Sequence, residues 1–341
     1  MKPEQKRRYG QQLRTSMISA LMTAIFMYLF YYPGWRSIGA GLAIGGTMPL
    51  ILELYTKFFY NRYLAKANLL IALFVNSAIH LLILIIVALL FVGIFYLNGD
   101  YKTLLSDFRF FYSHFFLIGI GFGLVLTVGF NFFSILNTLI GKHILGKLLI
   151  GMYRQPREVE RVFMFLDITS STSIAEQIGP KKFMSLVNDF FYDITEAVFQ
   201  SKGEIYKYVG DEVIITWKTP DAITSANCIR CFINIRHRIS QKSSYYQKTY
   251  GVIPNFKAGI HGGVAITGEL GYTRREIAYM GDVLNTTARI EEACKTFSKS
   301  LLLSETMFHQ LESKGDFKYD LVGEVKLRGK EKTTKLYSLL D

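Results

Sequence analysis

Cysteine is scarce in this chain of 341 residues, which contains only Cys228, Cys231 and Cys294. An odd and low count excludes a disulfide framework and is typical of a reducing compartment. Cys228 and Cys231 form a CxxC pair, but no second pair follows at the spacing of a zinc site. The pair lies in a run with helical periodicity, residues 221–240, so we interpret both cysteines as small buried side chains.

Acidic residues are scarce in the first half of the chain. Residues 1–155 contain 14 Lys and Arg against 4 Asp and Glu, whereas residues 156–341 contain 25 against 23. Most of the net charge of +12 therefore accompanies the long apolar runs. A nucleic-acid-binding protein would carry such an excess on a folded soluble domain. The distribution favours a lipid bilayer as partner and argues against nucleic acid.

Four apolar segments are long enough to span a bilayer as helices, which takes about 20 residues. Basic residues gather before the first segment, between the second and third, and after the fourth. By the positive-inside rule, this alternation predicts a multi-pass protein of the cell membrane with its N-terminus and C-terminal half in the cytoplasm. We expect neither a cleaved signal peptide nor a lipid anchor. The segments are Ser16–Tyr32, Ile38–Leu54, Leu69–Leu97 and Phe115–Leu139.

The pattern predicts three parts: an all-α membrane bundle of four helices in residues 1–139, a cytoplasmic linker in 140–160, and an α+β domain in 161–341. Strand and helix signals alternate in the last part, and there is no internal repeat or low-complexity segment. The expected strands are 161–167, 206–209, 213–217, 256–261, 265–270, 301–303, 317–326 and 335–339. The expected helices are 171–200, 221–240, 282–297 and 305–312.

The first strand of the α+β domain ends in an acidic residue, Asp167, followed by ITSSTS. Small hydroxyl residues open the next helix, whose free N–H groups and positive dipole end suit phosphates. A carboxylate just before that helix can hold the divalent cation that phosphates bring. Ordinary helix capping by the hydroxyls is the alternative, but capping does not need Asp167. The hydroxyl residues are Thr169, Ser170, Ser171 and Thr172.

A second acidic motif, YKYVGDEVII, occupies residues 206–215 and reads as two short strands around a tight turn. If this hairpin lies beside the first strand, Asp211 and Asp167 converge. Two carboxylates brought together repel unless a cation joins them. Two Mg²⁺ ions held by two aspartates are suited to phosphoryl or nucleotidyl transfer. Glu212 follows Asp211 and is expected to point the other way along its strand.

The segments FLDITSST, KYVGDE and GDVLNTTARIEEAC, in this order and spacing, resemble the catalytic domain of class III adenylyl and guanylyl cyclases. The resemblance is to bacterial members that end a membrane bundle with one such domain, and it covers about residues 161–340. It implies a ferredoxin-like βαββαβ core and a homodimer in which two domains pair head to tail and share each active site.

The resemblance also implies a division of roles between two subunits. Asp167 and Asp211 of one subunit, with the Ile168 carbonyl, would bind two Mg²⁺ or Mn²⁺ ions per active site. The partner would contribute Lys207 to the purine. It would also contribute Asn285 to the ribose and Arg289 to the α-phosphate, and these two residues lie on one face of a helix. In LRGKEK, Lys330 with its neighbour Arg328 resembles the family's basic loop over the triphosphate.

One position departs from the family pattern. The second purine-selecting residue falls at Ala278, where cyclases that make cyclic AMP usually have Asp or Thr. Lys207 nevertheless favours ATP, so we expect a membrane adenylate cyclase that makes 3′,5′-cyclic AMP and pyrophosphate. A guanylate cyclase of the same fold, and a membrane sensor whose domain only binds nucleotide, stay open as alternatives. An unidentified ligand of the membrane segments is left open as well.

Overall fold

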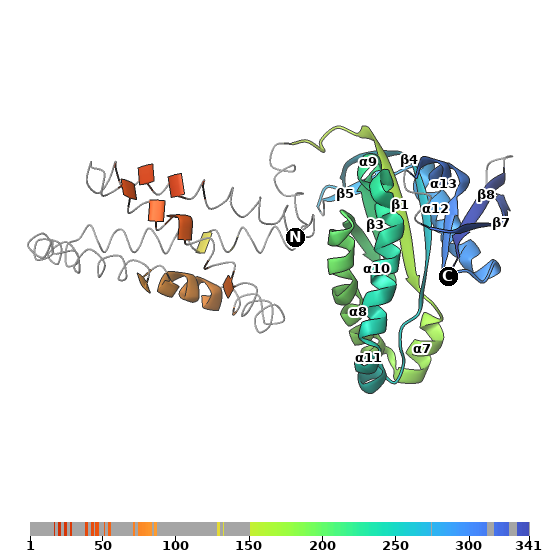
Figure 1. Ribbon diagram of the computed structural model, residues 1–341, viewed down its shortest axis with the longest axis horizontal. Helices are drawn as coiled ribbons and strands as arrows, with labels where there is room; N and C mark the ends of the chain where they lie inside the picture. Colours follow the sequence, from red (N-terminus) through yellow and green to blue (C-terminus); the bar gives the residue numbers. More distant parts are fainter. Residues whose placement is uncertain are drawn as a thin grey trace, which may run out of the picture. The chain divides into compact units, whose positions relative to one another are not determined.

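The fold is described from a computed structural model (Figure 1). The described residues are 151–340, apart from 274, 312–316 and 327–332, together with scattered positions between 17 and 132. Gly151–Asp341 forms a compact unit by itself. Within the described part of the chain, no helix is both long and apolar enough to cross a bilayer. The four expected spans fall largely outside the described residues, as do residues 140–150 of the expected linker.

One eight-stranded mixed sheet organises this unit, with β5 paired to the end of β4. The remaining strands lie in the order β2-β3-β1-β4-β6-β8-β7, and β1 pairs antiparallel with both β3 and β4. The strands are β1 (Arg157–Ile168), β2 (Glu204–Val209), β3 (Glu212–Lys218), β4 (Phe256–Leu270), β5 (Glu276–Met280), β6 (Leu301–Ser304), β7 (Tyr319–Lys326) and β8 (Thr333–Leu339).

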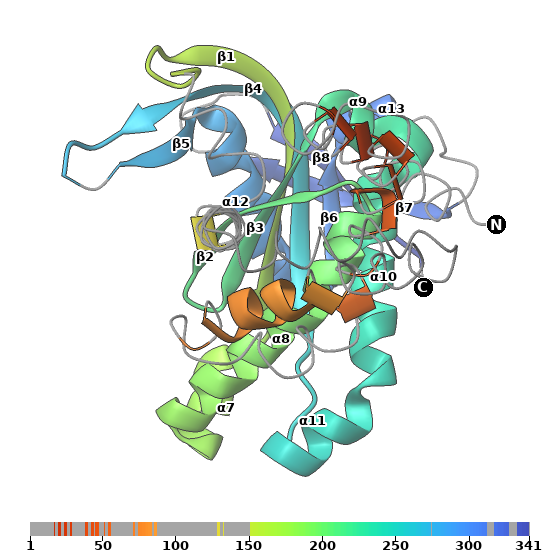
Figure 2. The ribbon, with the colours of Figure 1, turned by 90° about the vertical axis from the view of Figure 1, so that its left-hand side faces the viewer.

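Helices cover both faces of the sheet (Figures 1 and 2). Residues of α8 and α10 pack with one face of β1, and α12 packs on the other. The chain order β1, α7–α8, β2, β3, α9–α10, β4 is the βαββαβ arrangement that the family resemblance implies. The helices are α7 (Ser171–Ile178), α8 (Pro180–Gln200), α9 (Thr219–Ile223), η2 (Thr224–Ala226), α10 (Asn227–Gln241), α11 (Ser243–Tyr250), α12 (Asp282–Thr296) and α13 (Glu305–Gln310).

Strand β1 lies between the two helical layers, which explains its continuous apolar run. Because side chains alternate along a strand, Val162 and Met164 face α8 and α10 while Phe163 and Phe165 face α12. The same alternation puts Asp167 on the α12 side of the sheet. The residue that ends the buried strand therefore lies where helix α12 can reach it.

Several expected boundaries differ from the structure. The single helix expected over 171–200 is two helices, α7 and α8, which break at Gly179 (φ 83°) before Pro180. The helix expected over 221–240 begins only at Asn227, after α9 and η2. Strand β1 begins at Arg157, inside the expected linker.

The two strands expected around Gly262-Gly263 are one strand of 15 residues, β4. Glycine serves packing there and not a turn, because a Cβ on Gly262 would come within 3.1 Å of Val162 Cγ2. Strand β5 and helix α11 have no counterpart among the expected elements.

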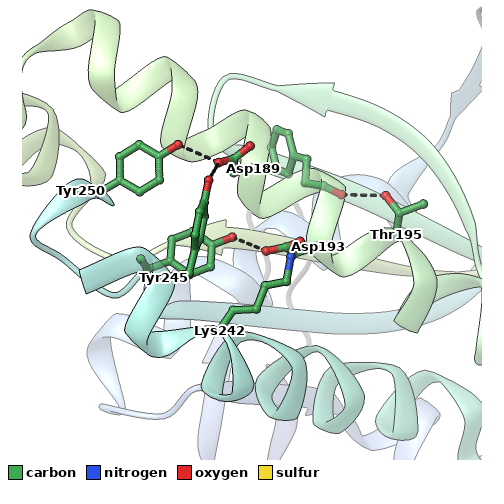
Figure 3. Close-up of polar contacts among 8 residues, drawn as sticks. Asp189, Asp193, Thr195, Lys242, Tyr245 and Tyr250 are labelled. Carbon is green, nitrogen blue, oxygen red and sulfur yellow. Dashed lines mark hydrogen bonds and ion pairs between the residues drawn. The ribbon is translucent and has the colours of Figure 1, made fainter. Parts of the chain in front are cut away.

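Helix α11 is tied to α8 by polar contacts that range from exposed to buried (Figure 3). Tyr245 and Tyr250 both donate hydrogen bonds to Asp189 Oδ2, at 2.6 and 2.8 Å. Tyr246 donates to Asp193, which also forms an ion pair with Lys242. These contacts compensate for burial of Asp193, whose side chain is 2% exposed. They account for a short, polar helix that apolar periodicity alone does not predict.

The three cysteines are free and buried. Burial raises the pKa of the Cys228 thiol to about 12, so this thiol stays protonated. The interpretation of Cys228 and Cys231 as small buried side chains is confirmed.

Candidate active site

Asp211 sits in a two-residue turn between β2 and β3, because Val209 pairs with Glu212 across the hairpin. Gly210 precedes it with φ 66°, a conformation that favours glycine. A Cβ at Gly210 would meet no atom within 4 Å, so the backbone angle and not lack of space requires glycine here. The turn carries Asp211 to the end of the sheet where β1 also ends.

The structure brings Asp167 and Asp211 together, as the two motifs predict. Burial, repulsion by Asp211 and a hydrogen bond with Asp211 raise the pKa of Asp167 to about 6. The Oδ2 atom of Asp211 is buried and has no hydrogen-bond partner. A buried carboxylate oxygen without a donor costs free energy unless a further group joins it.

Three further charged residues, which the sequence motifs do not assign to the site, join this pair. Glu212 lies opposite Asp167 on β3, and Lys257 lies opposite it on β4. Directly opposed residues of an antiparallel pair project to the same face, so Glu212 does not point away from Asp167 as expected. Burial, together with Glu291 on α12 and the two aspartates, raises the pKa of Glu212 to about 7.

Lys257 is the cation within this acidic cluster. Its Nζ lies 3.4 Å from Asp167 Oδ2 and 2.5 Å from Glu291 Oε1. Burial lowers the pKa of Lys257, but the two carboxylates outweigh burial and the net shift is upward. The Glu291 side chain is only 7% exposed, so Lys257 is the group that compensates its buried charge. The ammonium group thus joins β1 to helix α12.

Helix α12 approaches the sheet closely and exposes a second set of residues on its outer side. A Cβ on Gly259 of β4 would lie 2.3 Å from the Glu291 backbone nitrogen, so glycine is required for this contact. Asn285 and Arg289 face a surface hollow of about 640 Å³, away from the Asp167 cluster. The hollow is also lined by Glu292 and, from the end of β7, Glu324 and Val325.

Lys207 and Ala278, the expected purine-selecting pair, lie on β2 and β5. Lys207 Nζ is 3.3 Å from Glu276 Oε1, two residues before Ala278. Ala278 is buried, with 7% of its surface exposed. The structure therefore places a carboxylate next to Lys207 that sequence reasoning missed, because strand β5 was not expected.

The side chain of the N-cap residue of α7 does not cap this helix. Ser170 is the N-cap residue, has φ 58° and makes no side-chain capping hydrogen bond. The Thr169 N–H donates to the Asn255 carbonyl at 2.8 Å and is not free for a ligand. Arg328 and Lys330 fall outside the described residues, directly after β7.

The donor set near Asp167 and Asp211 fits a divalent cation. Two carboxylates, one with an unpartnered buried oxygen, are hard oxygen ligands of the kind that Mg²⁺ prefers. No group of three or more His, Cys, Asp or Glu side chains in the described part of the chain has the arrangement of a complete metal site. Further ligands would have to come from backbone carbonyls, water or substrate phosphates, which is usual for Mg²⁺.

A family model described as "Adenylate and Guanylate cyclase catalytic domain" matches residues 154–341. The chain belongs to this family. In sequence it is 35% identical over 201 residues to "Adenylate cyclase 2" of Rhizobium meliloti, which covers 59% of this chain and 55% of that protein. It is 29% identical over 182 residues to "Adenylate cyclase 1" of the same organism, covering 52% of this chain and 27% of the relative. The chain thus spans about half or less of these relatives.

The fold is also similar to a solved structure described as that of a bacterial light-regulated adenylyl cyclase. The TM-score is 0.54 at 18% sequence identity, and the match covers 64% of each chain. This likeness concerns the fold.

Proposed function

We propose that the protein is an adenylate cyclase that converts ATP to 3′,5′-cyclic AMP and pyrophosphate. The ribose 3′-oxygen forms a bond to the α-phosphorus, the bond from that phosphorus to the bridging α–β oxygen breaks, and the hydroxyl proton passes to solvent. The observation that carries the proposal is the convergence of Asp167 and Asp211, with an unpartnered oxygen on Asp211. Family membership and the similarity to proteins named adenylate cyclase support ATP as substrate.

In this proposal Asp167, Asp211 and the Ile168 carbonyl hold two Mg²⁺ or Mn²⁺ ions. Such ions, when bound, lower the pKa of the 3′-hydroxyl and neutralise charge on the triphosphate. Asp167 must ionise to bind them, and the raised pKa of about 6 means that it is mostly ionised at neutral pH. Lys257 and Glu291 keep the Asp167 side chain in place between β1 and α12.

The remaining roles are assigned across a head-to-tail homodimer. Lys207 of the partner contacts the purine, and Asn285 and Arg289 of the partner orient the ribose and stabilise charge on the α-phosphate. The hollow that the last two residues line in one subunit supports this assignment, because it leaves both side chains accessible. Arg328 and Lys330 are assigned to the triphosphate, and Thr169, Ser170, Ser171 and Thr172 to its surroundings.

Synthesis of cyclic GMP is the second candidate. Ala278 presents only a methyl group where a polar residue would help to select adenine. Incubation of the purified chain with ATP and GTP in parallel, with Mg²⁺ or Mn²⁺, decides between them by product identification. We expect cyclic AMP, and we expect Asp211→Ala to abolish it while the protein stays folded. Absence of any cyclic nucleotide from the wild-type chain would refute the enzyme proposal.

We also propose that the four apolar segments in residues 1–139 anchor the enzyme in the cell membrane, with the N-terminus and catalytic domain in the cytoplasm. The basis is the length of the apolar runs and the alternating basic flanks. Extraction of membranes with alkaline carbonate tests this: a multi-pass protein stays in the pellet. Release into the supernatant would contradict it.

A further inference from the structure

Lys207 forms its ion pair with the side chain of Glu276 and not with the residue at position 278. Lys207 Nζ lies 3.3 Å from Oε1 and 3.5 Å from Oε2 of Glu276, so the two carboxylate oxygens share one ammonium group. Both side chains are accessible, at 46% and 44% exposure. An exposed ion pair contributes little to stability, so opening it for a ligand costs little.

Half-buried contacts place this exposed pair. In the sheet, β3, β1 and β4 separate β2 from β5, yet the two strands meet across the α12 face. Tyr206 packs edge-on against Tyr279 with ring centroids 4.9 Å apart, and its hydroxyl accepts a hydrogen bond from the Tyr279 N–H. Phe163 of β1 packs on the same Tyr279 ring. The backbones that carry Lys207 and Glu276 are thereby fixed next to each other.

A β-bulge in β2 supports this placement. The pairing of β2 with β3 shifts between Ile205 and Lys207, which leaves Tyr206 as the extra residue. Without the bulge, neighbouring residues would project to opposite faces of the strand. A bulge re-aims side chains and commonly occurs next to functional sites. Here Tyr206 and the next residue, Lys207, both contact side chains or backbone of β5.

Strand alternation puts Glu276 on the same face of β5 as Ala278. Ala278 has no polar side-chain atom and is buried, whereas Glu276 is exposed and one methylene longer than aspartate. A longer acidic side chain, two residues away on one face, can supply the acceptor that alanine lacks.

We propose that Glu276 is a specificity-determining residue, which accepts a hydrogen bond from the 6-amino group of adenine while Lys207 donates one to adenine N1. The proposal rests on the proposed function and names how that site selects its base. Adenine presents an acceptor next to an amino donor on this edge, and the ammonium–carboxylate pair is complementary to both. On base binding, each side chain exchanges its partner for a group of the purine.

The test compares ATP with purine riboside 5′-triphosphate, which is ATP without the 6-amino group. In the wild-type chain we expect kcat/KM to be about tenfold or more higher for ATP, as for one hydrogen bond to a charged acceptor. In Glu276→Ala we expect this ratio to fall close to one. Glu269→Ala is the matched control. It removes another carboxylate of the same hairpin, one that forms an ion pair with Arg275 at 3.0 Å. We expect it to keep the wild-type ratio.

If Glu276→Ala leaves the ratio of the two kcat/KM values unchanged, even with equal losses for both substrates, the proposal is overturned. A wild-type chain that turns over GTP in preference to ATP, and loses this preference in the variant, would overturn the assignment to adenine. Calorimetric binding of the same two triphosphates separates this inference from the proposed function. If no nucleotide is cyclised but binding still depends on both Glu276 and the 6-amino group, only the enzyme proposal fails. If binding shows no such dependence, the inference fails too.

Discussion

Replacement of Asp211 by asparagine should stabilise the metal-free protein at alkaline pH while it removes activity. The substitution keeps the size and hydrogen-bonding capacity of the side chain but takes away one of two adjacent charges. The rise in the pKa of Asp167 from 3.8 to about 6 corresponds to ~3 kcal/mol against its ionised form. Burial is the largest cause and the Asp167 side chain is 25% exposed, so we assign ~1 kcal/mol to Asp211 after solvent screening.

The pH dependence has a defined sign. The folded-state pKa of Asp167 lies above its unfolded-state value, so the folded state binds more protons between the two values. The resulting stabilisation is complete below about pH 4 and is lost as the pH rises through about 6. Glu212, whose pKa is raised to about 7, extends the loss to higher pH. Asp211→Asn should therefore increase stability at pH 8 and change it little at pH 5.

Tryptophan fluorescence can report on the catalytic domain alone. The chain has two tryptophans, Trp35 and Trp217, and Trp217 is fully buried in the sheet. In a Trp35→Phe background with chelator present, we expect Asp211→Asn to raise the Tm by about 3 °C at pH 8. Asp320→Asn, on the exposed part of β7, is the control and should have no effect. A gain that persists at pH 5, or no gain at pH 8, would refute the reasoning.

Two further predictions concern the links from this cluster to the rest of the site. Lys257→Met should destabilise the metal-free domain by about 2 kcal/mol at pH 8, measured by the same fluorescence, because it leaves buried Glu291 without its cation; a neutral effect would contradict the role given to Lys257. Mixing Asp167→Ala with Arg289→Ala subunits should restore about a quarter of wild-type cyclase activity, because half of the randomly formed dimers contain one intact site. Demonstrated heterodimers without activity would argue against a shared site.

Local motifs predicted the parts of the site that depend on adjacent residues. The strand that ends at Asp167 and the turn at Gly210-Asp211 are short-range features, and both are observed. Glu212, Lys257 and Glu291 could not be assigned in the same way. Their contacts depend on strand register and on the close approach of α12 to Gly259, which separate segments of the chain determine. Register becomes known only when the sheet is known.

Strand β5 illustrates a different limit. It is five residues long and reads EIAYM, with Glu276 at its exposed end. Its position depends on the pairing with the far end of β4, a long strand that two glycines made look like two short ones. The expected strand 265–270 contains the residues that pair with β5, but nothing local in the sequence indicates this pairing. The sequence motif therefore identifies Lys207 but does not identify the carboxylate next to it.

Helix α12 has different roles on its two sides. Glu291 faces inward to Lys257 and, through it, to Asp167 of the same subunit. Asn285 and Arg289 face the outer hollow, where the shared-site proposal puts the nucleotide bound by the partner's aspartates. The helix rests on Gly259 with no space for a Cβ, so it cannot shift toward the sheet. In the proposed head-to-tail dimer, a change of charge at Asp167 would therefore act on a helix whose opposite side lines the other active site.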